Sequence, residues 1–424
     1  MTTLISTPAP TAPVHRRAHR ALWVLQWLLG ISLVVAGVFK LSLPADQAVE
    51  MFPWAADGPV LFTMTSVLDV LGGLGVILPS LTRILPRTTV LAALGVVLLM
   101  LSAVVFYLAR GEASEIVVNL VLAAVAAVIA WGRWRIAPIT GQLPEPTHMT
   151  GTLPVATPPV EMTLHQLPTG SYLTRGAFAV TGGSFTDQRT FVSTAVLVRH
   201  PQGDLLIDAG FGANADAHIE TLPSFRRAPH DLAETASDQL DAVGYDRRNL
   251  LGVLLTHSHW DHVSGLDSLD VPVWLTAAEA QHAAASRSDT VFQTVSRGHE
   301  IREYTFDGPA YLGFPESYDV HGDGSVVIVP AAGHTTGSVI VFVALPFGVR
   351  YAFIGDLTWQ LDGITGRREK PLMMRMLADS DARQVRRDME RIIALEHQVQ
   401  IVPAHDARAY AGIPVLSAGQ GGAA

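Results

Sequence analysis

Cysteine is absent from this chain of 424 residues. Its absence excludes disulfide bonds, thiolate metal ligands and a cysteine nucleophile. Positive charge is also scarce: 29 lysines and arginines stand against 38 acidic residues, with no basic stripe or aromatic-interleaved basic patch. We therefore expect no nucleic-acid partner. The chain does contain 16 histidines, so any metal site has to use nitrogen and oxygen ligands.

Hydrophobic residues make up 49% of the chain, and the mean hydropathy is +0.31. The excess lies in the first 136 residues, which suggests one membrane part and one soluble part, and the length also favours two domains. A spanning helix needs about 20 apolar residues. Four segments approach or reach that length, at residues 21–43, 61–78, 88–108 and 116–131. They predict an all-α, four-helix transmembrane bundle over residues 15–136, preceded by a disordered Pro/Thr-rich tail at residues 1–14.

The first apolar segment follows three arginines, as in a signal peptide, but its length and the three later spans favour a retained helix. Positive residues lie before the first span, between the second and third, and after the fourth: Arg16, Arg17, Arg20, Arg83, Arg87, Arg133 and Arg135. The opposite loops carry mainly acidic residues. The positive-inside rule then predicts a multi-pass protein of the cell (inner) membrane, with both termini and the C-terminal domain in the cytoplasm.

Asp69 lies near the middle of the second predicted span. A carboxylate at that depth is energetically costly and usually faces the bundle interior or a cavity. Two interpretations stay open: a ligand or proton site that includes Lys40 or Asn119, or a structural hydrogen bond between helices. The stretches "LLGISLVVAGVFKL", "LDVLGGLGVIL" and "NLVLAAVAAVIAWGR" resemble the DoxX-like family of four-helix membrane proteins, over about residues 20–136. The resemblance implies a membrane module.

Prolines and threonines dominate residues 137–162, which predicts an extended linker. Beyond it, short strand-like runs alternate with helix-like segments, among them Ala277–Ala285 and an amphipathic stretch at residues 380–396. This alternation predicts an α/β sandwich over residues 163–415, followed by a flexible tail at residues 416–424.

The run "LLTHSHWDHVSGL" places three histidines and an aspartate directly after an apolar strand-like segment. His257 and His259 are two residues apart, so an extended chain directs both to one side. Asp261 and His262 follow on the next turn and can reach a second point. Imidazole and carboxylate ligands suit zinc, and also iron or manganese.

Further polar residues follow other strand-like runs, and strand ends at one edge of a sheet can converge on one site. We predict two sets of metal ligands joined by Asp356: the first comprises His257, His259 and His334, and the second Asp261, His262 and His405. A pair of metals at such a site can hold a bridging hydroxide and polarise a carbonyl group. Asp208 has no place left among the ligands, so we expect it to orient a ligand histidine or to cap a loop.

These motifs, together with "PAAGHTTGS", "FIGD", "PAHD" and the upstream "LLIDAG", resemble the metallo-β-lactamase superfamily over about residues 163–412. The resemblance implies an αββα sandwich, with two Zn²⁺ held by the two sets at one edge. True β-lactamases generally lack the aspartate that matches Asp356, so a hydrolase branch is implied, and the spacings look most like N-acyl-homoserine lactonases. One departure is Trp359, which stands where lactonases typically carry a tyrosine.

We predict a membrane-anchored dinuclear zinc hydrolase that cleaves an ester, lactone or thioester through a metal-bridging hydroxide, with Asp261 orienting the nucleophile and passing a proton. Its partners are a small-molecule carbonyl substrate and the lipid bilayer. Trp260 and Trp359 are expected to line the substrate pocket. The charged run at residues 367–370 is expected to be solvated, with binding of an anionic substrate group as the alternative. The alternatives are a glyoxalase II-like thioesterase, a persulfide dioxygenase-like oxidoreductase with one Fe²⁺, and a membrane scaffold with a vestigial site, against which the complete ligand set argues.

Overall fold

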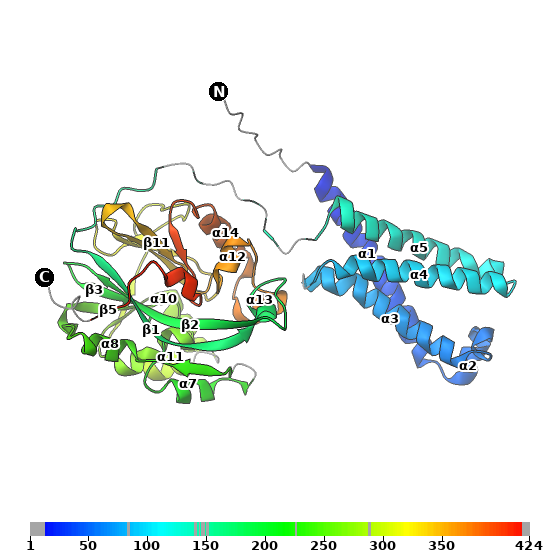
Figure 1. Ribbon diagram of the computed structural model, residues 1–424, viewed down its shortest axis with the longest axis horizontal. Helices are drawn as coiled ribbons and strands as arrows, with labels where there is room; N and C mark the ends of the chain where they lie inside the picture. Colours follow the sequence, from blue (N-terminus) through cyan, green and yellow to red (C-terminus); the bar gives the residue numbers. More distant parts are fainter. Residues whose placement is uncertain are drawn as a thin grey trace, which may run out of the picture. The chain divides into compact units, whose positions relative to one another are not determined.

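The computed structural model describes residues 13–82, 85–139, 142, 143, 145, 149, 152–224, 227–286 and 290–417. The chain divides into two compact units, Met1–Gly141 and Gln142–Ala424 (Figure 1). The predicted linker, residues 137–162, therefore extends past this division. Leu143 is buried in the core of the second unit, and the backbone N–H of Thr157 donates to the carbonyl oxygen of Asp323. This part of the segment packs against the second unit.

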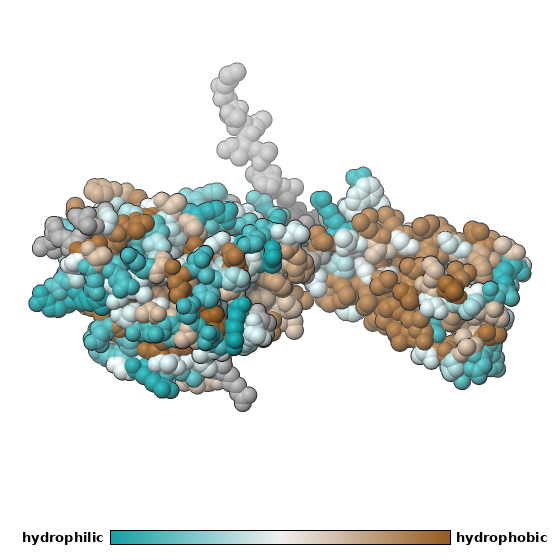
Figure 2. All heavy atoms as spheres, turned by 60° about the horizontal axis from the view of Figure 1, so that its bottom comes forward, coloured by the Kyte–Doolittle hydropathy of each residue, from teal (hydrophilic) through white to brown (hydrophobic). Residues whose placement is uncertain are grey.

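The N-terminal unit is helical. Its four long helices are α1 (Pro13–Ser42), α3 (Pro59–Thr82), α4 (Thr88–Ala109) and α5 (Ile116–Trp131), with the short α2 (Ala45–Met51) between the first two. Each long helix contains or coincides with most of a predicted span, and four stretches are long and apolar enough to cross a membrane: residues 17–42, 59–82, 88–109 and 113–136. Apolar side chains cover much of the visible surface of this unit (Figure 2), as expected for a protein whose solvent is lipid.

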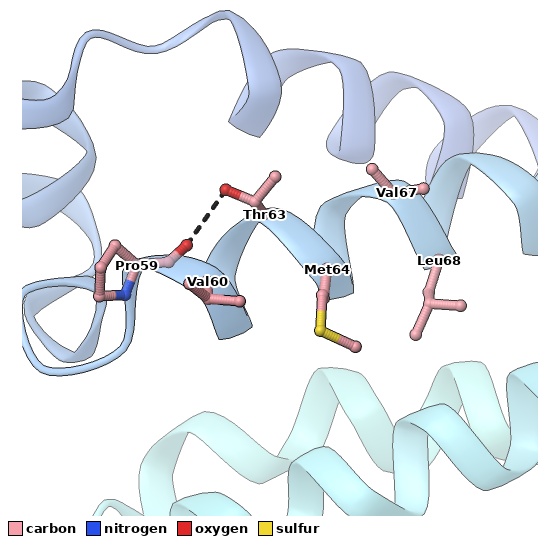
Figure 3. Close-up of a pocket in the computed structure, with 6 residues that line it drawn as sticks. All are labelled: Pro59, Val60, Thr63, Met64, Val67 and Leu68. Carbon is pink, nitrogen blue, oxygen red and sulfur yellow. Dashed lines mark hydrogen bonds between the residues drawn. The ribbon is translucent and has the colours of Figure 1, made fainter.

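Small residues let α1 and α3 approach closely. A Cβ atom on Gly73 would lie 2.5 Å from the carbonyl oxygen of Gly30, so any side chain there would force the helices apart. Near its start, α3 carries a shallow hollow lined by Val60, Met64 and their neighbours (Figure 3). The hydroxyl of Thr63 donates to the carbonyl oxygen of Pro59 at 3.1 Å, so the one polar side chain drawn in this hollow is satisfied within its own helix.

The C-terminal unit contains two sheets. The first has the order β4-β1-β2-β3-β5-β6-β7 and the second β12-β11-β10-β9-β8. The strands are β1 (Thr163–Arg175), β2 (Gln188–Arg199), β3 (Asp204–Ile207), β4 (His230–Leu232), β5 (Leu250–Leu254), β6 (Val273–Thr276), β7 (Ile301–Tyr304), β8 (Tyr318–Asp319), β9 (Val326–Pro330), β10 (Val339–Ala344), β11 (Arg350–Phe353) and β12 (Gln400–Val402).

Three hydrophobic clusters separate four layers. Buried side chains from β2, β3 and β5 meet those of β9, β10 and β11 between the two sheets. The outer face of the first sheet packs against α8 (Ala236–Ala242), α9 (Trp260–Val263), α10 (Ala277–Ala285) and α11 (Thr290–Val295). The outer face of the second sheet packs against α14 (Ala382–Ile393). The predicted αββα sandwich after four long apolar helices is confirmed.

Strand direction brings the functional residues to one edge. The parallel pair β3 and β5 belongs to the first sheet. In the second sheet β11 is parallel to β12, and both β9 and β11 are antiparallel to β10, so β9, β11 and β12 all run the same way. Polar residues follow the carboxyl end of each of these strands, and the sandwich therefore gathers them in one place.

Candidate metal centre

Every predicted metal ligand lies just beyond a strand that ends at this edge. His257, His259, Asp261 and His262 follow β5, with α9 beginning at Trp260. His334 follows β9, Asp356 follows β11, and His405 follows β12. The structure brings all seven together, as two neighbouring groups: His257, His259, His334 and Asp356, and Asp261, His262 and His405.

The first group is built from three imidazoles. The Nδ1 atom of His259 lies 3.1 Å from Nε2 of His257 and 2.9 Å from Nε2 of His334. Two nitrogen ligands of one tetrahedral zinc ion are about 3.3 Å apart when each Zn–N distance is about 2.0–2.1 Å. The spacing of these nitrogen atoms therefore fits a shared cation.

Asp356 divides its two oxygen atoms between the groups. Its Oδ2 lies 3.3 Å from Nε2 of His334 and 3.8 Å from Nε2 of His257. Its Oδ1 lies 2.9 Å from Nε2 of His405 and 3.3 Å from Nε2 of His262. Oδ2 of Asp261 completes the second group at 3.5 Å from Nε2 of His405. This is the arrangement of a carboxylate that can bind one metal with each oxygen.

Two atoms of the second group and one of Asp356 are buried without a hydrogen-bond partner among the described residues. They are Nε2 of His262, Nε2 of His405 and Oδ1 of Asp356. A buried polar atom that makes no hydrogen bond costs about 1–3 kcal/mol, so three such atoms at one point need an explanation. A bound cation satisfies all three, and the residues present therefore fit a metal pair.

The electrostatics of His257 and Asp356 also suit ligation. Burial, followed by the neighbouring imidazoles, lowers the pKa of His257 well below its ordinary value, which keeps the ring in its neutral, metal-binding form. Burial acts to raise the pKa of Asp356, but the imidazoles of His405, His262 and His334 outweigh it and lower that pKa well below the usual range. Asp356 is thus a carboxylate at neutral pH.

Three buried carboxylates outside the ligand set contact the ligand loops. Asp208 accepts hydrogen bonds from the backbone N–H of Thr256 at 2.7 Å and lies 2.8 Å from Nδ1 of His262. It adopts a left-handed backbone conformation with φ of 55°, a strain that is typical of functional sites. The predicted orienting role of Asp208 matches this geometry and remains a prediction.

Glu279 and Asp379 are the other two, and the sequence patterns did not reveal either. Glu279 accepts from the backbone N–H groups of Ser258 and Gly337 at 2.7 and 3.0 Å, so it ties the His257–His259 segment to the loop after His334. Asp379 lies 2.9 Å from Nδ1 of His334. Such partners fix the orientation of ligating imidazoles.

The predicted solvation of residues 367–370 is wrong for Glu369 and Lys370, which are each only 1% exposed. Nζ of Lys370 lies 2.6 Å from Oδ1 of Asp379 and 3.0 Å from Nδ1 of His334. Glu369 accepts hydrogen bonds from the guanidinium group of Arg386 at 2.9 and 2.7 Å. A charge run looks solvated in sequence because the partners that neutralise it are distant in the chain.

A pocket opens beside the ligand cluster, lined by residues that include the predicted Trp260 and Trp359. The indole N–H of Trp359 donates to Oδ2 of Asp356 at 2.7 Å. The pocket also contains Tyr172 of β1, whose hydroxyl donates to Oδ2 of Asp261 at 2.8 Å. No pattern in the sequence pointed to this phenol. The available signal was indirect: with tryptophan at position 359, any phenol at the site had to come from elsewhere.

In the N-terminal unit the predicted polar residues Lys40 and Asp69 form an ion pair, with Nζ and Oδ2 2.9 Å apart. Asn119 does not join them, because its amide donates to the carbonyl oxygen of Glu115. Of the two interpretations given for Asp69, a link between helices α1 and α3 is what the contacts display. A ligand or proton role for the pair remains a prediction.

Comparisons with known proteins bear on both units. Residues 189–405 match the metallo-beta-lactamase superfamily, and residues 24–129 match the DoxX-like family. A "Probable metallo-hydrolase" of Mycobacterium tuberculosis is 30% identical over 283 residues, which cover 62% of this chain and 86% of that protein. An N-acyl homoserine lactonase of Rhizobium radiobacter is 25% identical over 234 residues, covering 51% and 82%. A solved N-acyl homoserine lactone hydrolase with its product bound is 16% identical, with a TM-score of 0.48 over 62% of this chain and 98% of that one.

The family match spans half of the chain, and its residues contain the whole ligand cluster that the structure assembles. The relative from M. tuberculosis extends the match over most of its own length. The chain therefore belongs to the metallo-beta-lactamase superfamily, as a metal-dependent hydrolase that carries a DoxX-like domain ahead of its hydrolase domain.

Proposed function

We propose that this protein is a membrane-anchored dinuclear zinc hydrolase that opens a lactone or cleaves a related ester or thioester. The observation that carries the proposal is Asp356, whose two oxygen atoms face two separate groups of nitrogen and oxygen ligands. A mononuclear site has no use for the second group. Imidazole and carboxylate ligands without thiolates suit zinc.

The metal pair would supply a water nucleophile at neutral pH and polarise the substrate carbonyl. The chain's own residues have to place the substrate and manage the proton. Asp261 lies on the pocket wall, and the Tyr172 hydroxyl fixes one of its oxygen atoms. Asp261 is then positioned to take the proton of the attacking water and pass it to the leaving oxygen. The Trp359 N–H fixes Asp356 in the same way.

The lactone preference is supported by the relative from R. radiobacter, which is named as an N-acyl homoserine lactonase. The lactonase tyrosine is replaced by Trp359 here, and Tyr172 offers a phenol from another strand, at a hydrogen-bonding distance of 2.8 Å from Asp261. The four candidate spans support anchoring in a bilayer. The distribution of arginines supports a cytoplasmic hydrolase domain.

Metal content and substrate range test the proposal together. The full-length protein, purified in detergent, is analysed for metals and then assayed on lactones, oxoesters, thioesters and a persulfide. We expect two zinc ions per chain and lactone opening that is lost in His257→Ala but kept in the matched control His230→Ala. One iron per chain with oxygen uptake on the persulfide would establish the dioxygenase instead. A metal-replete protein inert to every carbonyl substrate would overturn the proposal.

A further inference from the structure

The short helix α13 (Leu372–Ala378) exposes large apolar side chains. Met376 is 77% exposed, and Met373 and Leu377 are also more than half exposed. Its inner side is packed, because Met374 and Ala378 contact the cluster of Phe191 and Trp359 beside the metal centre. The helix is therefore anchored, and its outward methionines are a fixed feature of the surface.

Another exposed apolar residue lies near the outward side of α13. Phe185, which is 59% exposed, lies in the connection between β1 and β2, and its ring meets that of Phe178 edge to face at 5.5 Å. Figure 1 draws α13 beside this connection, and Met374 packs against the cluster that includes Ala179 of the connection. We call Phe185, Met373, Met376 and Leu377 the apolar rim. An exposed patch of this kind next to a site marks a docking surface.

The apolar rim continues into the pocket of the metal centre. Phe178, Met373 and Leu377 line that pocket, together with His259 and Asp261 of the ligand cluster. A molecule that rests against the rim can thus extend to the metal ligands along apolar side chains. An apolar chain attached to a carbonyl group fits such a path.

Charge indicates what covers the rim. Arg175 and Arg227 are exposed and line the same pocket. Arginine beside apolar side chains suits the interfacial layer of a bilayer, where anionic headgroups lie next to acyl chains. A protein partner would need its own acidic surface, whereas the chain already carries four candidate membrane spans.

The connection to those spans is short. The chain passes from Ile136, the end of η3 (Gly132–Ile136), to the buried Leu143 in seven residue steps. A fully extended chain covers about 25 Å in that number of steps. A bilayer that contains the spans is therefore within reach of the hydrolase domain.

We propose that the apolar rim inserts into the interfacial layer of an anionic bilayer, and that the enzyme takes from it a lipid-dissolved carbonyl compound with an apolar chain. The choice of substrate rests on the proposed hydrolase function. The insertion of the rim does not, so the two are tested by separate measurements.

The absence of cysteine makes the first measurement direct. A single cysteine replaces Met376 in the full-length protein, carries an environment-sensitive fluorophore, and is reconstituted in phosphatidylcholine vesicles with or without phosphatidylglycerol. The matched control is Phe347→Cys, at an exposed phenylalanine in the β10–β11 turn, at the end of β11 opposite Asp356. We expect a blue shift and quenching by brominated lipid at position 376, stronger with phosphatidylglycerol, and neither at position 347. A label at 376 that stays as solvated as that at 347 overturns the insertion. A blue shift without lipid quenching overturns it too, because a partner protein or a second copy then covers the rim.

The second measurement compares two lactones that share a ring but carry a short or a long acyl chain, both presented to the reconstituted protein. We expect Met376→Asp to lower hydrolysis of the long-chain lactone by about tenfold and to leave that of the soluble one unchanged. Equal loss on both, or on neither, overturns lipid delivery. If the wild type hydrolyses neither lactone, the proposed function and this substrate class fail, while the fluorescence result on the rim still stands.

Discussion

Each unit of this protein buries an aspartate that meets basic side chains of its own unit, and the two aspartates differ in how many surround them. Asp69 in the helical unit meets the Nζ of Lys40 at 2.9 Å, and the two charges neutralise one another. Asp356 in the sandwich meets imidazoles of four histidines, and its Oδ1 has no hydrogen bond among the described residues. A self-neutralised pair needs no ligand, whereas a carboxylate among unsatisfied imidazoles needs a cation.

The largest effect expected from this difference follows the removal of the Asp356 charge. Asp356→Asn keeps the volume of the side chain but weakens both metal positions at once. Loss of an outer partner of a metal ligand typically costs about 10–100-fold in affinity or activity, so loss of the shared ligand should exceed a hundredfold in kcat/KM. Metal content per chain should fall with it, as measured by elemental analysis.

The matched control for this variant is Asp388→Asn. Asp388 is also fully buried, but it lies on α14 and pairs with Arg391. That variant should lose stability and keep its metal. Equal metal loss in both variants would mean that the sandwich had unfolded. The contrast between Asp356 and Asp69 would then not be supported by the metal loss.

A smaller effect is expected from Asp208→Asn. The carboxylate lies 2.8 Å from Nδ1 of His262, so its loss frees the ring that we propose as a ligand of the second metal. Affinity for one of the two zinc ions should fall about 10–100-fold, measured by competition with a chromophoric chelator. Asp204→Asn is the control, since Asp204 begins β3, the strand that ends just before Asp208, and accepts a hydrogen bond from the Tyr245 hydroxyl away from the ligands. If it weakens zinc as much, Asp208 has no specific orienting role.

Tyr172→Phe should lower kcat/KM without lowering the metal content. Its hydroxyl donates to Asp261 at 2.8 Å, and a hydrogen bond to a charged group contributes about 1.5–3 kcal/mol. We expect kcat/KM for the lactone to fall about tenfold or more, with two zinc ions retained. Tyr304→Phe, which removes a buried hydroxyl without a partner among the described residues, should change little. Zinc lost in Tyr172→Phe would assign the tyrosine to metal retention.

The sequence predicted which side chains the fold brings together, because each of them stands beside a strong local pattern. Apolar runs mark β5, β9, β11 and β12, and the polar residue after each run is visible without knowledge of the fold. The shared direction of these strands then brings the polar residues together, since strand ends at one edge of the sandwich lie close to one another. The alternation of such runs with helix-like segments gave the α/β sandwich, and the resemblance to the metallo-β-lactamase superfamily implied its αββα layers.

The outer partners could not be predicted in this way. Tyr172 lies on β1. The sequence of this strand contains Pro168 and Gly170, which do not favour a strand, and the pairing with β2 shifts its register between them. Lys370 looks exposed until Asp379 and His334 are placed around it. These roles depend on contacts between distant segments, and no local pattern in the sequence encodes them.

The smallest effect on hydrolysis is expected from Asp69→Asn. The pair lies in the helical unit and is satisfied internally, so lactone hydrolysis should stay unchanged while the melting temperature of the full-length protein falls. An ammonium left without its carboxylate costs about 1–3 kcal/mol, and the double variant Lys40→Met with Asp69→Leu should recover part of that loss, because it removes both charges together. A different result would show that the pair serves a ligand or a proton. In that result the double variant regains full stability, but the helical unit loses binding or transport of that ligand or proton. In that case Asp69 and Asp356 would both be functional carboxylates, and internal neutralisation would no longer separate a structural aspartate from a catalytic one.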